Sequence, residues 1–144
     1  MPFRELPVPA RLAIAHYMAL DGEAWGLPPE YIHASVQRIP REFRSMLPWF
    51  TKEYGSQLFG LVEIPMNVLT ETIMRDDELR HSGFLDFDDY HEWFSETGIP
   101  NHPKTSRWPV ILSSFPEETL QDGWHRLHDY YRKGARTVPA VYFP

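Results

Sequence analysis

The fold is decided by the stretch Thr119-Leu120-Gln121-Asp122-Gly123-Trp124-His125-Arg126-Leu127, in which a predicted strand passes directly into a predicted helix. We expect the strand over residues 117–121 and the helix from there to Lys133. Asp122 is predicted to cap this helix, because a short acidic side chain can accept hydrogen bonds from the first backbone N–H groups. Gly134 is a favourable residue for the end of the helix.

The sequence on either side predicts further strands and helices in alternation. Strands are expected over residues 58–64, 108–112 and 138–143, where short apolar runs stop at turn residues. Helices are expected over 11–20, 29–39, 41–54 and 86–94, where apolar residues recur at helical spacing. Residues 70–75 fit both types, and 98–103 are predicted to form a loop. The result is a mixed α/β chain of the α+β class, with residues 1–55 as a helical N-terminal extension packed on a sheet domain of residues 56–144.

Composition excludes several classes of protein. The chain has 144 residues, no cysteine, 20 acidic and 14 basic side chains, and a net charge of -6. Without cysteine there is no disulfide framework, thiolate metal site or thiol nucleophile. No apolar run approaches a membrane span and no signal peptide is recognisable, so we expect a soluble, cytoplasmic protein of one domain. Bulk acidity disfavours nucleic acid, although residues 102–144 carry six basic and four acidic side chains.

The turn at the start of the predicted helix has the residue types of an anion site. A helix N-terminus offers free backbone N–H groups and a partial positive charge. Gly123 removes the side chain that would keep a ligand from the backbone, and Arg126 can form two parallel hydrogen bonds with phosphate oxygens. In the alternative, purely structural interpretation, Asp122 caps the helix, Gly123 makes the turn and Arg126 pairs with an outer acid.

Four segments together resemble the ParB/sulfiredoxin superfamily. They are Val62-Glu63-Ile64-Pro65-Met66-Asn67-Val68-Leu69, Pro109-Val110-Ile111-Leu112, the stretch from Thr119 to Leu127, and Gly134-Ala135-Arg136-Thr137-Val138-Pro139-Ala140-Val141. That family has an opening strand ending in Ile/Val-Pro, an Asp-Gly-x-His-Arg helix start, a glycine after the helix and an apolar strand with Ile/Val-Pro. The resemblance covers about residues 58–143 and implies a small ParB/sulfiredoxin-like sheet domain.

The resemblance also implies a nucleotide or phosphate site at this turn, with ATP, CTP or ADP and Mg²⁺ as the ligands to consider. Activities in the superfamily include DNA-segregation clamps, a sulfinic-acid reductase, amino-acid kinases and nucleases. The reductase needs a cysteine in the turn, where this chain has Trp124-His125, so that activity is excluded. The DNA-reading domain of the segregation proteins is not expected after Pro144. Many relatives have alanines where this chain has His128 and Asp129, which predicts an altered pocket or a shifted helix face.

The candidate site residues follow from these two arguments. If the chain transfers phosphate, the resemblance implies a carboxylate base shortly after the opening strand, for which Glu71 is the first candidate and Glu63 the second; the alternative is a solvent-exposed glutamate. A metal set of His125 and His128 with Asp122 and His102 lacks a recognisable spacing, so no metal site is predicted. The predicted phosphate-binding residues are Asp122, Gly123, Trp124, His125 and Arg126, with Lys104 and Arg107 as further contacts.

Three functions remain open at the level of sequence. The leading one is a protein that binds a nucleotide or other small phosphate ligand, with turnover as a nucleotide-dependent phosphotransferase or hydrolase left undecided. The second is a non-catalytic interaction module, in which the turn is structural and the aromatic N-terminal helices dock on a protein partner. The third is a nuclease or DNA-associated protein, which the net charge disfavours.

Overall fold

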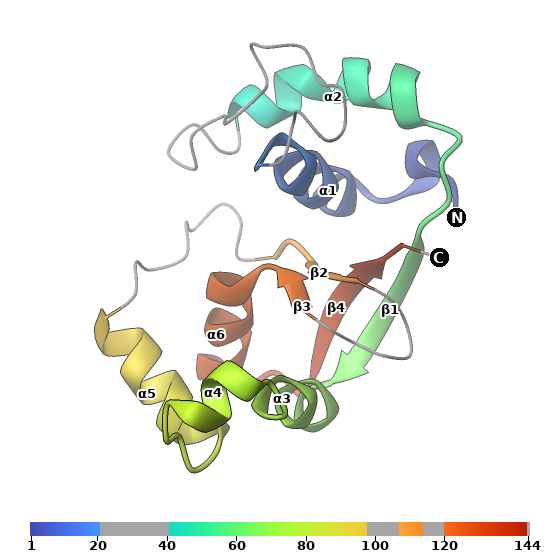
Figure 1. Ribbon diagram of the computed structural model, residues 1–144. Helices are drawn as coiled ribbons and strands as arrows, with labels where there is room; N and C mark the ends of the chain where they lie inside the picture. The colour runs from blue at the N-terminus through green and yellow to red at the C-terminus, as the bar shows by residue number, and fades with distance from the viewer. Residues whose placement is uncertain (21–40, 98–106, 114–119, 144) are drawn as a thin grey trace.

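A computed structural model describes residues 1–20, 41–97, 107–113 and 120–143. These residues form helices and a sheet, which confirms the α+β class (Figure 1). The helices are η1 (Phe3–Glu5), α1 (Val8–Leu20), α2 (Arg41–Tyr54), α3 (Met66–Met74), α4 (Asp77–His81), α5 (Phe87–Thr97) and α6 (Trp124–Arg132), and the strands are β1 (Gly60–Pro65), β2 (Val110–Leu112), β3 (Leu120–Asp122) and β4 (Thr137–Tyr142). None of the helices in these ranges is long and apolar enough to cross a membrane.

The sheet is mixed and has the strand order β1-β4-β2-β3. β4 pairs antiparallel with β1 and parallel with β2, and β2 pairs antiparallel with β3. Because side chains alternate between the faces of a sheet, Val141 and Ile111 share one face and Ala140 and Val110 share the other. All four side chains are fully buried, so the centre of the sheet is covered on both sides.

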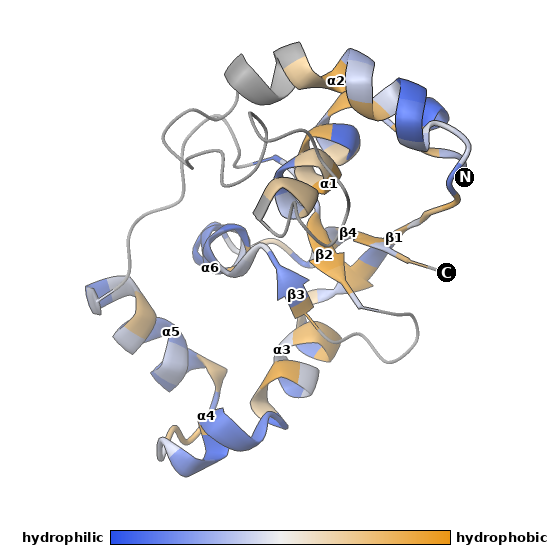
Figure 2. Cartoon of the chain, turned by 45° about the horizontal axis from the view of Figure 1, so that its top comes forward, coloured by the Kyte–Doolittle hydropathy of each residue, from blue (hydrophilic) through white to orange (hydrophobic). Residues whose placement is uncertain are grey.

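Helices cover each face of the sheet with a separate core. η1, α1 and α2 pack with Ile111 and Val141 on one face. α3, α5 and α6 pack with Val110, Val138 and Ala140 on the other. Figure 1 shows α1 and α2 on one side of the sheet and α3 and α6 on the other. Coloured by hydropathy, β2 is hydrophobic and the peripheral helix α4 hydrophilic (Figure 2), as expected for an inner and an outer element.

The helix predicted over residues 86–94 forms as α5, and its first turn is acidic. The Asp89 backbone N–H donates to the Asp86 carboxylate at 2.9 Å, and the Leu85 N–H donates to the Asp89 carboxylate at 3.1 Å. These two bonds satisfy backbone donors that the helix itself leaves unpaired. On the predicted apolar face Tyr90 is buried, but Trp93 is 50% exposed.

The prediction that Asp122 caps the last helix is wrong. Asp122 is the final residue of β3, where it pairs with Ile111, and α6 begins only at Trp124. The cap is Gly123, which adopts the left-handed conformation and offers no side-chain acceptor. Residues 70–75, whose sequence fits both a helix and a strand, belong mostly to α3. The predicted helix over 29–39, the predicted loop over 98–103 and residues 117–119 of the predicted strand lie outside the described residues.

Candidate functional site

The turn between β3 and α6 needs a glycine for two reasons. Gly123 has a φ of +97°, a conformation that costs other residues free energy. A Cβ at this position would lie 3.0 Å from Nη2 of Arg126 and 3.1 Å from Cα of Val110. The first α6 hydrogen bond runs from the Leu127 N–H to the Gly123 carbonyl, at 2.8 Å. The three N–H groups before Leu127 therefore have no acceptor in the helix, and Gly123 supplies none.

Arg126 lies beside this turn and is buried with unused donors. Only 4% of the residue is exposed, and neither Nε nor Nη2 has a hydrogen-bond partner among the described residues. The guanidinium carbon lies 5.8 Å from the centre of the Trp108 ring. Burial lowers the pKa of Arg126, and the nearby Asp122 opposes that shift. Because an arginine keeps its charge in a protein, this site holds a buried cation whose Nε and Nη2 donors have no partner in the part of the chain that the structure describes.

Asp122 carries the nearest negative charge, but its carboxylate is too far from the Arg126 guanidinium to form a hydrogen bond. Its Oδ2 lies 3.7 Å from Nη2 of Arg126 and 3.7 Å from Nδ1 of His16 in α1. Burial on its own would raise the pKa of Asp122, but His16, Arg126 and the Gly123 backbone together lower it. The carboxylate is therefore ionised at neutral pH and forms a loose ion pair with Arg126.

The other two residues of the predicted turn have different surroundings. His125 is exposed, and its ring lies 5.0 Å from that of Phe94 in α5. Trp124 is partly buried against the core between the sheet and α6. Of this turn, the unpaired backbone N–H groups and the Arg126 guanidinium are the groups that can bind an anion; Asp122 acts on such a ligand through Arg126.

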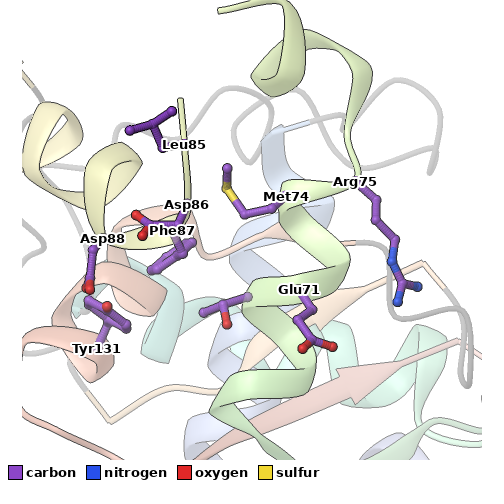
Figure 3. Close-up of a pocket in the computed structure, with 9 residues that line it drawn as sticks. Glu71, Met74, Arg75, Leu85, Asp86, Phe87, Asp88 and Tyr131 are labelled. Atoms are coloured by element: carbon purple, nitrogen blue, oxygen red, sulfur yellow. The ribbon is translucent and has the colours of Figure 1, made fainter. Parts of the chain in front are cut away.

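The two predicted catalytic glutamates line other hollows. Glu71 is exposed in a cleft of about 670 Å³ between α3, the start of α5 and Tyr131 of α6. In Figure 3, Glu71 and Arg75 extend from α3 on one side of this cleft, and Asp88 and Tyr131 lie on the other. Glu63 lines a second hollow of about 520 Å³ together with Arg107. None of residues 122–126 lines either hollow, and Lys104 lies outside the described residues.

His16 is the site residue that the sequence analysis missed. It is 6% exposed and lies among α1 residues that are almost all buried and apolar. Its ring is also 6.3 Å from that of Trp108, which packs beside Arg126. The interruption of the apolar run Leu12–Leu20 by His16 was the available signal, since buried polar groups require partners.

His128 has a structural partner in α5. Its Nδ1 lies 2.7 Å from Nδ1 of His91, and the two rings are stacked. His128 is 1% exposed, and burial together with His91, His125 and Arg132 lowers its pKa to about 3. Within the described ranges, no group of three or more His, Asp or Glu side chains is placed to hold a metal ion.

Comparisons with protein-family models, curated proteins and solved structures found no match for this chain. A binding site at the β3–α6 turn is therefore inferred from the geometry of that turn and from the residues that form it.

Proposed function

We propose that the chain binds a phosphate-bearing ligand at the N-terminus of α6, and that this ligand is a nucleotide. The observation that carries the proposal is the buried guanidinium of Arg126, whose Nε and Nη2 lack partners among the described residues beside a glycine turn. A buried, unpaired donor costs free energy, and an anion that accepts from it recovers that cost.

Phosphate fits these groups better than a monovalent anion does. It has several acceptor oxygens and two negative charges, so it can accept from Arg126 and from the first N–H groups of α6 at the same time. The nearby Asp122 carboxylate offsets part of the Arg126 charge and repels any anion, so the attraction must come from the guanidinium donors and the helix N-terminus. The sequence resemblance adds the nucleotide, because superfamily members bind ATP, CTP or ADP at the corresponding turn.

The proposed function is binding, without an assigned reaction. A phosphotransferase or hydrolase would need a base within hydrogen-bond reach of the reacting oxygen. Glu71 and Glu63 line hollows to which the turn does not contribute. Turnover is tested in the same experiment, as release of phosphate from ATP or CTP.

Calorimetric titration of ATP, CTP, ADP and inorganic phosphate, with and without Mg²⁺, tests the proposal. We expect saturable binding that Arg126→Met weakens at least about tenfold, corresponding to about 1.4 kcal/mol. The matched control is Arg132→Met, because Arg132 is on the same helix but its side chain is 56% exposed and paired with Asp129. Absence of binding at millimolar concentration, or equal binding by Arg126→Met and the wild type, would contradict the proposal.

The alternative function, a non-catalytic module that binds a protein partner, is favoured by exposed apolar residues at or near α5. α1 already uses its apolar residues inside the chain, so it offers little to a partner. Leu85 is 91% exposed and Trp93 is 50% exposed, and both lie at or near α5. If no phosphate compound binds, substitution of these two residues by serine followed by measurement of self-association tests that alternative.

A further inference from the structure

His16 belongs to the same buried polar group as Asp122 and Arg126, although it comes from the other helical layer. α1 packs on the face of the sheet opposite to α6, and His16 extends from it to within 3.7 Å of Asp122 Oδ2. The same oxygen lies 3.7 Å from Nη2 of Arg126. One carboxylate oxygen is thus approached by α1 and by α6.

The distance between Asp122 and Arg126 determines whether the arginine is available to a ligand. Charge-assisted hydrogen bonds between guanidinium and carboxylate measure about 2.8 Å and commonly form in pairs. A carboxylate at that distance would occupy the donors that a phosphate needs. The observed 3.7 Å is about 0.9 Å longer, and Nε and Nη2 have no partner within the described residues.

Two features hold the carboxylate at this distance. The Asp122 backbone is fixed in β3 by its pairing with Ile111, so the side chain must reach Arg126 by rotation alone. His16 Nδ1 lies 3.7 Å from Oδ2, as far as Arg126 Nη2 does and beyond hydrogen-bond distance, and the ring is held in place, since it is 6% exposed and packs edge-on to Trp108. Loss of that contact frees the carboxylate to rotate toward the guanidinium.

We propose that His16 is a positioning residue of the anion site, which holds the Asp122 carboxylate off Arg126 and so keeps the guanidinium donors available to phosphate. This inference rests on the proposed function for its consequence, but the contact between His16 and Asp122 can be tested without any ligand. It makes α1, which the sequence places in the N-terminal extension, a part of the site.

The binding test compares dissociation constants for inorganic phosphate and ADP in five chains: wild type, His16→Phe, His16→Asn, Asp122→Asn and the double variant His16→Phe/Asp122→Asn. Phe keeps the ring against Trp108 but removes the polar contact, whereas Asn restores a donor near the position of Nδ1. We expect His16→Phe to bind about tenfold more weakly and His16→Asn to stay within about threefold of the wild type. Asp122→Asn should bind more tightly, because a repelling charge is removed.

The double variant gives the decisive comparison. If His16 acts only through Asp122, the double variant binds like Asp122→Asn, because no carboxylate remains to be held back. Equal weakening by His16→Phe in both backgrounds would overturn the inference, as would an unchanged dissociation constant in His16→Phe. His16→Leu serves as a second variant if His16→Phe does not fold, as judged by its melting temperature.

A ligand-free measurement separates failure of this inference from failure of the proposed function. In a nitrogen–proton correlation spectrum, we expect the Arg126 Nε–H signal to move downfield in His16→Phe, as Asp122 closes on the guanidinium, and to stay in place in His16→Asn. An unmoved signal in His16→Phe overturns the positioning role. Absence of phosphate binding by the wild type overturns the proposed function. The position of the Arg126 Nε–H signal in His16→Phe then still tests whether His16 positions Asp122.

Discussion

Two buried polar side chains of α6, His128 and Arg126, can be compared directly. The free-energy cost of burying them is reduced in different ways. In the middle of the helix, His128 meets His91 of α5 with 2.7 Å between their Nδ1 atoms, and its lowered pKa keeps it neutral. At the N-terminus, Arg126 is almost as deeply buried, but an arginine cannot become neutral in this way.

The comparison explains why the proposed ligand is placed at Arg126 and not at His128. The Nδ1 atoms of the two histidines face each other, which stabilises the contact between α5 and α6, although Nε2 of His128 is buried without a partner among the described residues. Arg126 has a counter-charge at 3.7 Å, and its Nε and Nη2 have no hydrogen-bond partner among the residues that the structure describes. In the proposed function, the first group contributes to stability and the second binds the ligand.

The largest effect is expected from Asp122→Asn. Removing one partner of a buried ion pair leaves an uncompensated charge, so the free energy of unfolding should fall by about 3 kcal/mol. Phosphate at millimolar concentration should restore part of this loss, because it replaces the missing counter-charge. The measurement is urea unfolding with and without phosphate.

Asp129→Asn is the matched control for this loss. Asp129 lies in α6 and pairs with Arg132 and Lys133, whose side chains are 56% and 61% exposed, so its removal should cost at most about 1 kcal/mol. Equal losses in the two variants would remove the distinction between a carboxylate that faces a buried arginine and one that pairs with exposed cations.

The second prediction concerns pH and the histidine pair. The pKa of His128 is about 3 in the folded chain and about 6.5 when unfolded, so the unfolded state binds the proton first on acidification. This contribution to stability is complete above about pH 6.5 and is lost as the pH falls toward 3. Between pH 7 and pH 5 the free energy of unfolding should drop by about 2 kcal/mol.

His128→Phe should remove most of this pH dependence, since a ring without a titrating group replaces the imidazole next to Phe94. His81→Gln is the control, because His81 lies exposed in the short helix α4. Unfolding curves at pH 7, 6 and 5 provide the comparison. If the free energy of unfolding of His128→Phe depends on pH as steeply as that of the wild type, other titrating groups are responsible.

The third and smallest effect compares the two glycines that flank α6. Both have positive φ values, +97° for Gly123 and +74° for Gly134, but a Cβ at Gly134 would meet nothing within 4 Å. Gly134→Ala should therefore cost about 1 kcal/mol for its backbone conformation alone. Gly123→Ala should cost about 1 kcal/mol more, because the methyl group must displace Arg126 or Val110. Equal melting temperatures for the two variants would contradict the close packing of the turn.

Most of the fold could be predicted from the sequence, because its strands and helices are marked locally. The apolar run of β2, the Ile64-Pro65 end of β1 and the acidic start of α5 all lie where pattern and capping rules place them. The helix start at Asp122 was misplaced by one residue. Capping preference favours an aspartate there, but sheet pairing with Ile111 retains Asp122 in β3 and leaves the cap to glycine.

The site could be predicted only in part. The turn and Arg126 are adjacent in sequence, so their proximity follows from helix geometry. His16 is more than a hundred residues away, and its contact with Asp122 depends on how α1 packs against the sheet. Glu71 and Glu63 are predicted from their position near the opening strand. Position along the chain does not show which hollow each side chain lines.

The central claim is that phosphate binds at the N-terminus of α6, and a nitrogen–proton NMR titration of the wild-type chain with inorganic phosphate and ADP tests it most directly. We predict saturable shifts of the backbone N–H signals of Trp124, His125 and Arg126 and of the Arg126 Nε–H. Signals from Arg132 and from the cleft around Glu71 should stay in place. Shifts confined to that cleft, or no shifts at millimolar ligand, would contradict the account.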